Sequence, residues 1–191
     1  RMLAYSSVAQ VGYMVLGVSL VSLTGLTAAF LHLFNHALIK SALFMAVGCM
    51  MYRTGSARLD DLRGLGRQMP WTFTAFALAG LSIIGVPTTA GFVSKWYLIL
   101  ASVEAGAWWL VMLVVLTSMM AVYYIWRVIE AAWFSPRPEQ AAAVREAPLA
   151  LLIPTWLVVA LNFYFGLDTR LTVGAANAAA SAMLGSGAQI P

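Results

Sequence analysis

Long apolar stretches separated by short polar loops dominate the chain. A membrane-spanning helix needs about 20 mostly apolar residues, and the stretches 3–21, 23–52, 107–134 and 148–167 approach or exceed that length. Tryptophans stand near both ends of the third stretch, as aromatic residues do at the membrane–water interface. The pattern therefore predicts helices that cross a bilayer.

A different pattern covers residues 70–104. Two apolar pieces, 70–86 and 90–104, meet at a break that contains glycine and proline. Each piece of about 15 residues reaches only ~22 Å as a helix, which is short of a hydrocarbon core of about 30 Å. Two short halves that meet in this way are typical of the discontinuous helices of transporters. We therefore expect one broken crossing over 70–104, in an all-α integral membrane protein with about five crossings.

The arginines support this assignment. With one broken crossing over 70–104, Arg1 and the loops 53–69 and 135–147 fall on the same side of the membrane. The other side receives few charged residues: Glu104, Asp168 and Arg170. Because cytoplasmic loops carry an excess of Lys and Arg, we expect the loops 53–69 and 135–147 to be cytoplasmic.

The composition agrees with a membrane location. Hydrophobic residues make up 62% of the 191 residues and charged residues only 9%, whereas soluble proteins carry roughly 25% charged residues. The net charge of +4 does not indicate a nucleic-acid partner, because the arginines lie in short loops beside the spans. The chain starts at Arg1 and is apolar from residue 3, so we interpret it as the later part of a longer membrane protein. We expect residues 1–167 to form the transmembrane domain, and the Ala/Gly/Ser-rich residues 168–191 to be a surface or poorly ordered tail.

Ionisable residues inside the apolar stretches are the candidates for chemistry. His32, His36 and Lys40 are spaced four residues apart, so they form a stripe on one helix. Successive groups rise by ~6 Å, a distance that one or two waters can bridge. Lys95 follows Gly91 by four residues and therefore lies close to the break. A charge at the bilayer centre costs at least ~2.5–3.5 kcal/mol, so these groups either face a hydrated interior or stay neutral.

The sequence leaves three interpretations of these groups open. In a proton relay they exchange protons through water, with further residues as candidates to hold that water: Asn35, Ser41, Thr88, Thr89 and Ser94. In a structural scaffold they only form hydrogen bonds between helices. A metal site is the third interpretation, because His-x3-His places two imidazoles on one helical face. However, no cysteine or carboxylate is close in sequence and Lys40 would repel a cation, so we expect no metal.

Polar residues also occur in the first apolar stretch. Ser6, Ser7, Gln10 and Tyr13 form a stripe that faces either water or a neighbouring helix. The residues alone do not distinguish a functional role for this stripe from a packing role.

Four blocks of the sequence resemble one family. They are, in order, RMLAYSSVAQVGYMVLG, FLHLFNHALIKSALFMAVG, LRGLGRQMP and GLSIIGVPTTAGFVSKWYLIL. Together they are similar to the antiporter-like membrane subunits of respiratory complex I (NADH–quinone oxidoreductase), of Mrp-type Na+/H+ antiporters and of membrane-bound hydrogenases. The resemblance covers residues 1–166 and is specific, because both the blocks and their spacing match.

This resemblance implies two inverted repeats, each with a discontinuous helix, and places the chain in the second repeat. It also implies a proton path along buried lysines, histidines and waters. His32, His36 and Lys40 fall on the family's His/His/Lys helix, and Lys95 falls on the broken-helix position that carries lysine or glutamate. The glutamate and lysine of the family's first repeat are absent from this chain, which would then hold only the outlet half of a path.

The function implied is proton translocation, by cation/H+ antiport or by redox-coupled pumping, in a bacterial cytoplasmic (inner) membrane. The expected partners are H+, Na+ in the antiporter case, the lipid bilayer and other membrane subunits of an Mrp-type or complex I-like assembly. The segments GFVSKWYLILASVEAG and VYYIWRVIEAAWF are most similar to the D-type subunits of Mrp antiporters, and the shorter complex I subunits stay open. The chain shows no nucleotide, haem or iron–sulfur motif, so we expect no cofactor and no catalytic redox site of its own.

Overall fold

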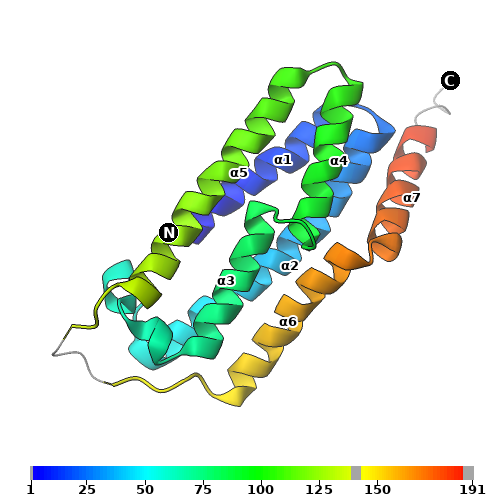
Figure 1. Ribbon diagram of the computed structural model, residues 1–191. Helices are drawn as coiled ribbons and strands as arrows, with labels where there is room; N and C mark the ends of the chain where they lie inside the picture. Colours follow the sequence, from blue (N-terminus) through cyan, green and yellow to red (C-terminus); the bar gives the residue numbers. More distant parts are fainter. Residues whose placement is uncertain (1, 139–142, 187–191) are drawn as a thin grey trace.

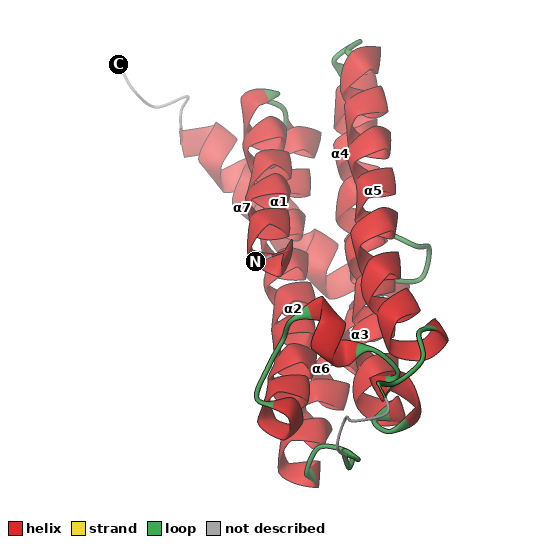
Figure 2. Cartoon of the chain, turned by 90° about the vertical axis from the view of Figure 1, so that its left-hand side faces the viewer, coloured by secondary structure: helices red, strands yellow, loops and turns green. Residues whose placement is uncertain are grey.

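The protein is a bundle of helices (Figure 1). The structure, a computed structural model, describes residues 2–138 and 143–186, and over these residues all regular structure is helical (Figure 2). In chain order the elements are α1 (Met2–Ser19), α2 (Leu23–Thr54), η1 (Leu59–Leu62), η2 (Leu65–Arg67), α3 (Pro70–Ile84), α4 (Ala90–Glu104), α5 (Trp108–Ile129), η3 (Glu130–Phe134), α6 (Leu149–Leu167) and α7 (Arg170–Ser186).

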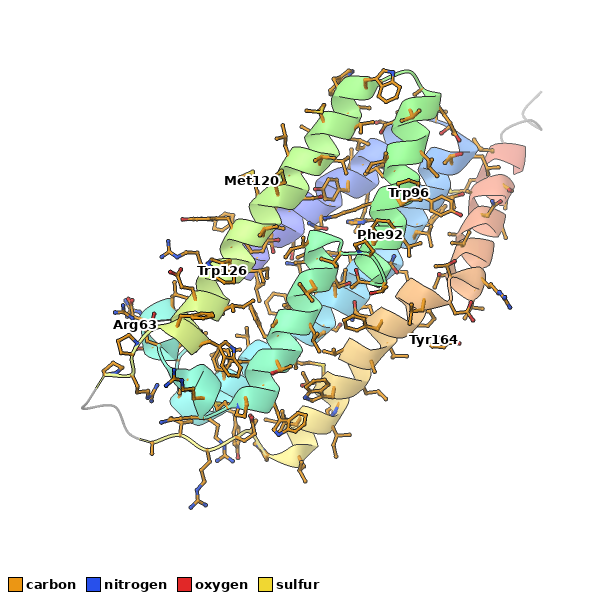
Figure 3. All side chains as sticks on the ribbon, in the orientation of Figure 1. Arg63, Phe92, Trp96, Met120, Trp126 and Tyr164 are labelled. Atoms are coloured by element: carbon orange, nitrogen blue, oxygen red, sulfur yellow. The ribbon has the colours of Figure 1, made fainter. Side chains whose placement is uncertain are left out.

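Several of these helices are long and apolar enough to cross a membrane. They are Met2–Ser19, Leu23–Thr54, Trp108–Phe134 and Leu149–Leu167, which correspond closely to the predicted stretches 3–21, 23–52, 107–134 and 148–167. On its outer side α5 carries apolar residues that point away from the bundle; Met120 is 68% exposed and Trp126 is 51% exposed (Figure 3). Such a surface fits a hydrocarbon environment. The all-α membrane fold predicted from the sequence is confirmed.

The central element is α2. Its 32 residues span ~48 Å, and it packs against α1, α3, α4, α6 and α7. The helix begins at Ser22, whose hydroxyl accepts a hydrogen bond from the Gly25 N–H at 3.0 Å, and it ends at Gly55, which has a left-handed backbone. Residues in the middle of α2 are therefore enclosed by other helices.

The broken crossing is also present. α3 and α4, each 15 residues long, run in the same direction, and α5 returns alongside both of them (Figures 1 and 2). The first half ends at Ile84 rather than at the predicted residue 86. The reason is Gly85, whose φ of 91° ends the helix while its N–H still bonds to the carbonyls of Leu81 and Ser82.

The described parts of the two arginine-bearing loops lie at the same end of the bundle, near the start of α3 (Figure 1). Glu146 ties the second loop to the start of α3, where its carboxylate accepts hydrogen bonds from the Trp71 N–H (2.8 Å) and the Thr72 hydroxyl (2.5 Å). A carboxylate at a helix N-terminus is favourable because the exposed N–H groups there lack partners. Arg1 and residues 139–142, which belong to the predicted basic side, lie outside the described residues.

Beyond α6 the structure contains more order than the sequence suggested. Residues 168–191 were expected to be a surface or poorly ordered tail, whereas α7 forms a helix over Arg170–Ser186. It packs on α2 through small residues, of which Ala176 and Ala180 are buried. Alanine contributes little hydropathy but lets helices approach closely, which explains why a hydropathy-based reading overlooks this helix. Residues 187–191 lie outside the described residues.

Candidate functional site

Lys95 occupies the break between the two half-helices. It lies in the second turn of α4, and its side chain reaches back to the end of α3. The ammonium donates to the carbonyls of Ile83 and Ile84, each at 2.9 Å, and to the Ser118 hydroxyl of α5 at 2.9 Å. The last carbonyls of a helix lack intrahelical partners and carry partial negative charge. The residue is only 5% exposed. Its buried ammonium is therefore stabilised by the carbonyl groups at the end of α3.

Close packing holds the two half-helices together at this point. Gly91 lies so near the end of α3 that a Cβ atom there would be 1.8 Å from the Ser82 carbonyl oxygen. The Gly91 N–H donates to the Ser82 hydroxyl at 3.2 Å, and that hydroxyl donates to Asn162 of α6 at 3.2 Å. From α2, the Asn35 amide donates to the Ala90 carbonyl at 2.6 Å. The start of α4 is therefore fixed by three neighbouring helices.

His32 of α2 reaches the same region. Its Nδ1 lies 2.9 Å from the hydroxyl of Ser94, the residue before Lys95. Ser94 donates to the Gly91 carbonyl at 3.3 Å, so its oxygen is available to accept a hydrogen bond from the His32 Nδ1–H. The ring is 2% exposed and lies edge-on to Tyr13, with the ring centroids 5.3 Å apart. His32 and Lys95 thus border one polar region, at the junction of α1, α2, α4 and α5.

Three buried polar atoms near this region have no hydrogen-bond partner within the described part of the chain. They are Nε2 of His32, Nε2 of His36 and Oδ1 of Asn35. Buried polar atoms in proteins are normally paired, either with other groups of the protein or with buried water. The rings of His32 and His36 stack with their centroids 6.4 Å apart, so the two unpaired nitrogens belong to neighbouring groups on α2.

Lys40 lies two turns further along α2 from His32 and turns toward α1. Its ammonium donates to the Leu3 carbonyl at 2.7 Å and to the Ser6 hydroxyl, and the residue is 6% exposed. Both candidate lysines are therefore buried inside the bundle. They occupy different places: Lys40 bonds to the start of α1, whereas Lys95 bonds to the end of α3 at the helix break.

The residues proposed to hold water fall into two groups. Asn35 and Ser94 touch the site, as described above, and Thr89 is buried with its hydroxyl bonded to the Val86 carbonyl at 2.7 Å. Ser41 and Thr88 are exposed. Ser41 donates to the Ala37 carbonyl of its own helix at 2.8 Å, so it is not brought to the ionisable groups.

The sequence reading missed the contribution of α5. Ser118 binds Lys95, and Thr117 lies 2.5 Å from the hydroxyl of Tyr13. A signal was present, because Thr117 and Ser118 are an adjacent polar pair in the otherwise apolar segment 108–122. Among the described residues, no group of three His, Cys, Asp or Glu side chains is arranged to hold a metal.

Membrane-length helices around a broken crossing, with a buried lysine at the break, are features found in ion transporters. Comparison with known proteins gives the family. Residues 1–121 match the family described as "NADH:quinone oxidoreductase/Mrp antiporter, TM". The chain belongs to this family, which confirms the resemblance seen in the sequence.

Relatives and solved structures agree with this placement. NADH-quinone oxidoreductase subunit N of Desulforudis audaxviator is 43% identical over 166 residues, which are 81% of this chain and 33% of the relative. The Mrp complex of Dietzia sp. DQ12-45-1b contains a chain with a TM-score of 0.85 at 26% identity, matching 94% of this chain and 41% of that one. A membrane-bound sulfane sulfur reductase, an archaeal respiratory membrane complex, gives a TM-score of 0.80 at 37% identity, matching 86% of this chain and 27% of that one.

This chain spans about a third of the length of the curated relative. The relatives include both a subunit of an NADH-quinone oxidoreductase and a chain of an Mrp complex. Because relatives come from both branches of the family, the assignment of this chain to the D-type subunits of Mrp antiporters stays a prediction.

Proposed function

We propose that this chain is part of a proton-translocating membrane subunit in which Lys95, His32, His36 and Lys40 carry the protons. The observation that carries the proposal is the placement of Lys95. A buried ammonium sits at a helix break, and His32 is bonded to the residue beside it. Ionisable side chains inside a membrane are costly and mark ion pathways when they face a protein interior.

The lysine content of the chain supports the proposal. Its two lysines, Lys40 and Lys95, are both buried within helices of the bundle, whereas four of its arginines lie in loops: Arg58, Arg63, Arg137 and Arg145. Lysine can give up its proton when buried, but arginine stays charged in proteins. Lysine is therefore the basic residue suited to a transfer role at these two positions.

The histidines provide the intermediate positions. Among the described residues no hydrogen bond joins His32 to His36, or His36 to Lys40, so water has to bridge them. Successive members of the stripe rise by ~6 Å, and the unpaired Nε2 atoms of both histidines can accept hydrogen bonds from such water. A neutral imidazole takes a proton on one nitrogen and releases one from the other, which suits a relay.

The relatives suggest the partner subunits and the transported ion. Their names refer to a subunit of an NADH-quinone oxidoreductase and to a chain of an Mrp complex, so we propose other membrane subunits as partners. The transported ion is H+, exchanged for Na+ if the chain belongs to the antiporter branch. In a bacterial inner membrane the loops 53–69 and 135–147 face the cytoplasm.

A scaffold role is the competing function, and one observation favours it. All three N–H groups of Lys95 have partners, two of which are carbonyls of α3. The side chain would then only stabilise the break. The two functions differ in what happens when a lysine is replaced without loss of structure.

Lys40→Ala tests the end of the relay that lies away from Lys95. We expect proton transport by the assembled full-length complex to fall by about a hundredfold, because a proton-transfer group is lost. The measurement is proton uptake into vesicles, followed with a pH-sensitive dye. Arg170→Ala, which removes an exposed basic residue, is the control and should leave uptake unchanged. Unchanged uptake in correctly assembled Lys40→Ala would refute the assigned role of Lys40.

A further inference from the structure

A line of buried and half-buried polar side chains between α1 and α5 is not used by the histidine relay. On α1 its members lie on the inner face at spacings of four and three residues, and all of these are buried. On α5 its members lie on the side that faces α1. We call this line the α1–α5 seam: Ser6, Gln10, Tyr13, Thr117, Ser118 and Tyr124.

Both lysines bond to the seam. Lys95 donates to the Ser118 hydroxyl at 2.9 Å, and Lys40 donates to the Ser6 hydroxyl, beside which lies the Tyr124 side chain of α5. By contrast, over the described residues no hydrogen bond joins either lysine to a histidine. The direct polar contacts of the two lysines therefore lead to the seam from opposite ends.

Tyr13 is the central member of the seam. Its hydroxyl lies 2.5 Å from the Thr117 hydroxyl, and its ring lies under the Lys95 ammonium, 5.4 Å from the centroid. Thr117 already donates to the Leu113 carbonyl at 2.6 Å, so Tyr13 is the donor in its bond with Thr117. Thr117 and Ser118 are adjacent in the chain. Lys95 and Tyr13 thus contact neighbouring hydroxyls of α5, and within the described residues no direct hydrogen bond joins these two hydroxyls, so a water has to bridge them.

Gln10 fills the interval between Tyr13 and Ser6. It lies one turn from each on the same face of α1 and is 4% exposed. An amide both donates and accepts hydrogen bonds, so Gln10 can hold a water molecule between the two hydroxyls. Such a water would complete the seam across this interval.

We propose that the α1–α5 seam is a second proton link between Lys95 and Lys40, parallel to the histidines. This inference rests on the proposed function, because it needs both lysines to exchange protons. At each hydroxyl the arriving proton binds the oxygen and the hydroxyl's own proton leaves toward the next group. Each hydroxyl then turns back, so the seam is chemically unchanged after one transfer.

A double-mutant cycle in the assembled full-length complex tests the second link. Tyr13→Phe removes the hydroxyl but keeps the ring under Lys95, and His36→Leu interrupts the histidine stripe. With two parallel links, each single variant retains part of the proton uptake. The double variant should lose more than the product of the single losses, by about twofold or more. Thr117→Val, which removes the partner hydroxyl with little change of shape, should behave like Tyr13→Phe.

The other outcomes are equally informative. Tyr5→Phe, on the exposed side of α1, is the matched control and should have no effect in either background. If Tyr13→Phe and Thr117→Val change nothing in the His36→Leu background, or if the double variant is no worse than the poorer single variant, the second link is wrong. Unchanged uptake in both Lys40→Ala and Lys95→Ala would instead overturn the proposed function itself, so the two failures are distinguishable.

Discussion

Lys95→Ala is expected to abolish proton transport by the full-length complex without preventing its assembly. Lys95 is the ionisable group at the helix break and contacts groups of both links, through Ser118 and through the ring of Tyr13. Its removal therefore interrupts both at once. We expect proton uptake into vesicles to fall by about a hundredfold or more, the scale of a lost proton-transfer group.

The structural role of Lys95 needs a matched control, because its ammonium also binds the end of α3. Lys95→Gln serves this purpose. Its amide N–H groups can still donate to a carbonyl of Ile83 or Ile84, but an amide does not take up and release protons near neutral pH. We expect Lys95→Gln to retain most of the thermal stability that Lys95→Ala loses, and to transport no better. Wild-type transport by Lys95→Gln would show that Lys95 is only a structural cap.

Gly91→Ala is expected to have the largest effect on folding. A Cβ atom at this position would lie 1.8 Å from the oxygen and 2.9 Å from the carbon of the Ser82 carbonyl. Both are backbone atoms, so they cannot move aside as a flexible side chain can. Overpacking of a core typically costs 1–3 kcal/mol, and a backbone clash belongs at or above the top of that range, about 3 kcal/mol. The measurement is the thermal stability and yield of the detergent-solubilised full-length protein.

Gly48→Ala is the control for this substitution. Gly48 lies in α2, and a Cβ atom there would meet no atom within 4 Å. Because alanine also favours helix over glycine, we expect Gly48→Ala to be neutral or slightly stabilising. If Gly91→Ala assembled with unchanged stability, α3 and α4 could not approach each other as closely as the Gly91–Ser82 contact requires.

Much of the fold could be predicted because the bilayer restricts what a chain can do. Backbone polar groups have no water to bond with in the hydrocarbon region, so apolar stretches of sufficient length become helices. The broken crossing was predictable for the same reason, since neither 70–86 nor 90–104 spans the membrane alone. Helix α7 was not, because its alanines pack against α2 without raising hydropathy.

The sequence indicated which residue types belong to the site, but not which neighbours their side chains contact. Spacing placed His32, His36 and Lys40 on one stripe, yet the long side chain of Lys40 turns to α1, whose position the sequence does not specify. Ser41, which the sequence offers as a candidate to hold water, directly follows Lys40. A helix advances about 100° per residue, so Ser41 points away from the stripe to an exposed face.

The most direct test of the proton relay is to look for its water. A structure of the full-length complex, at a resolution that shows water, would reveal what lies beside the unpaired Nε2 atoms of His32 and His36. A relay predicts ordered water on both nitrogens, continuing to the ammonium of Lys40. Apolar side chains packed against both nitrogens, with no water between Lys95 and Lys40 along α2 or along the seam, would contradict proton transfer through this chain.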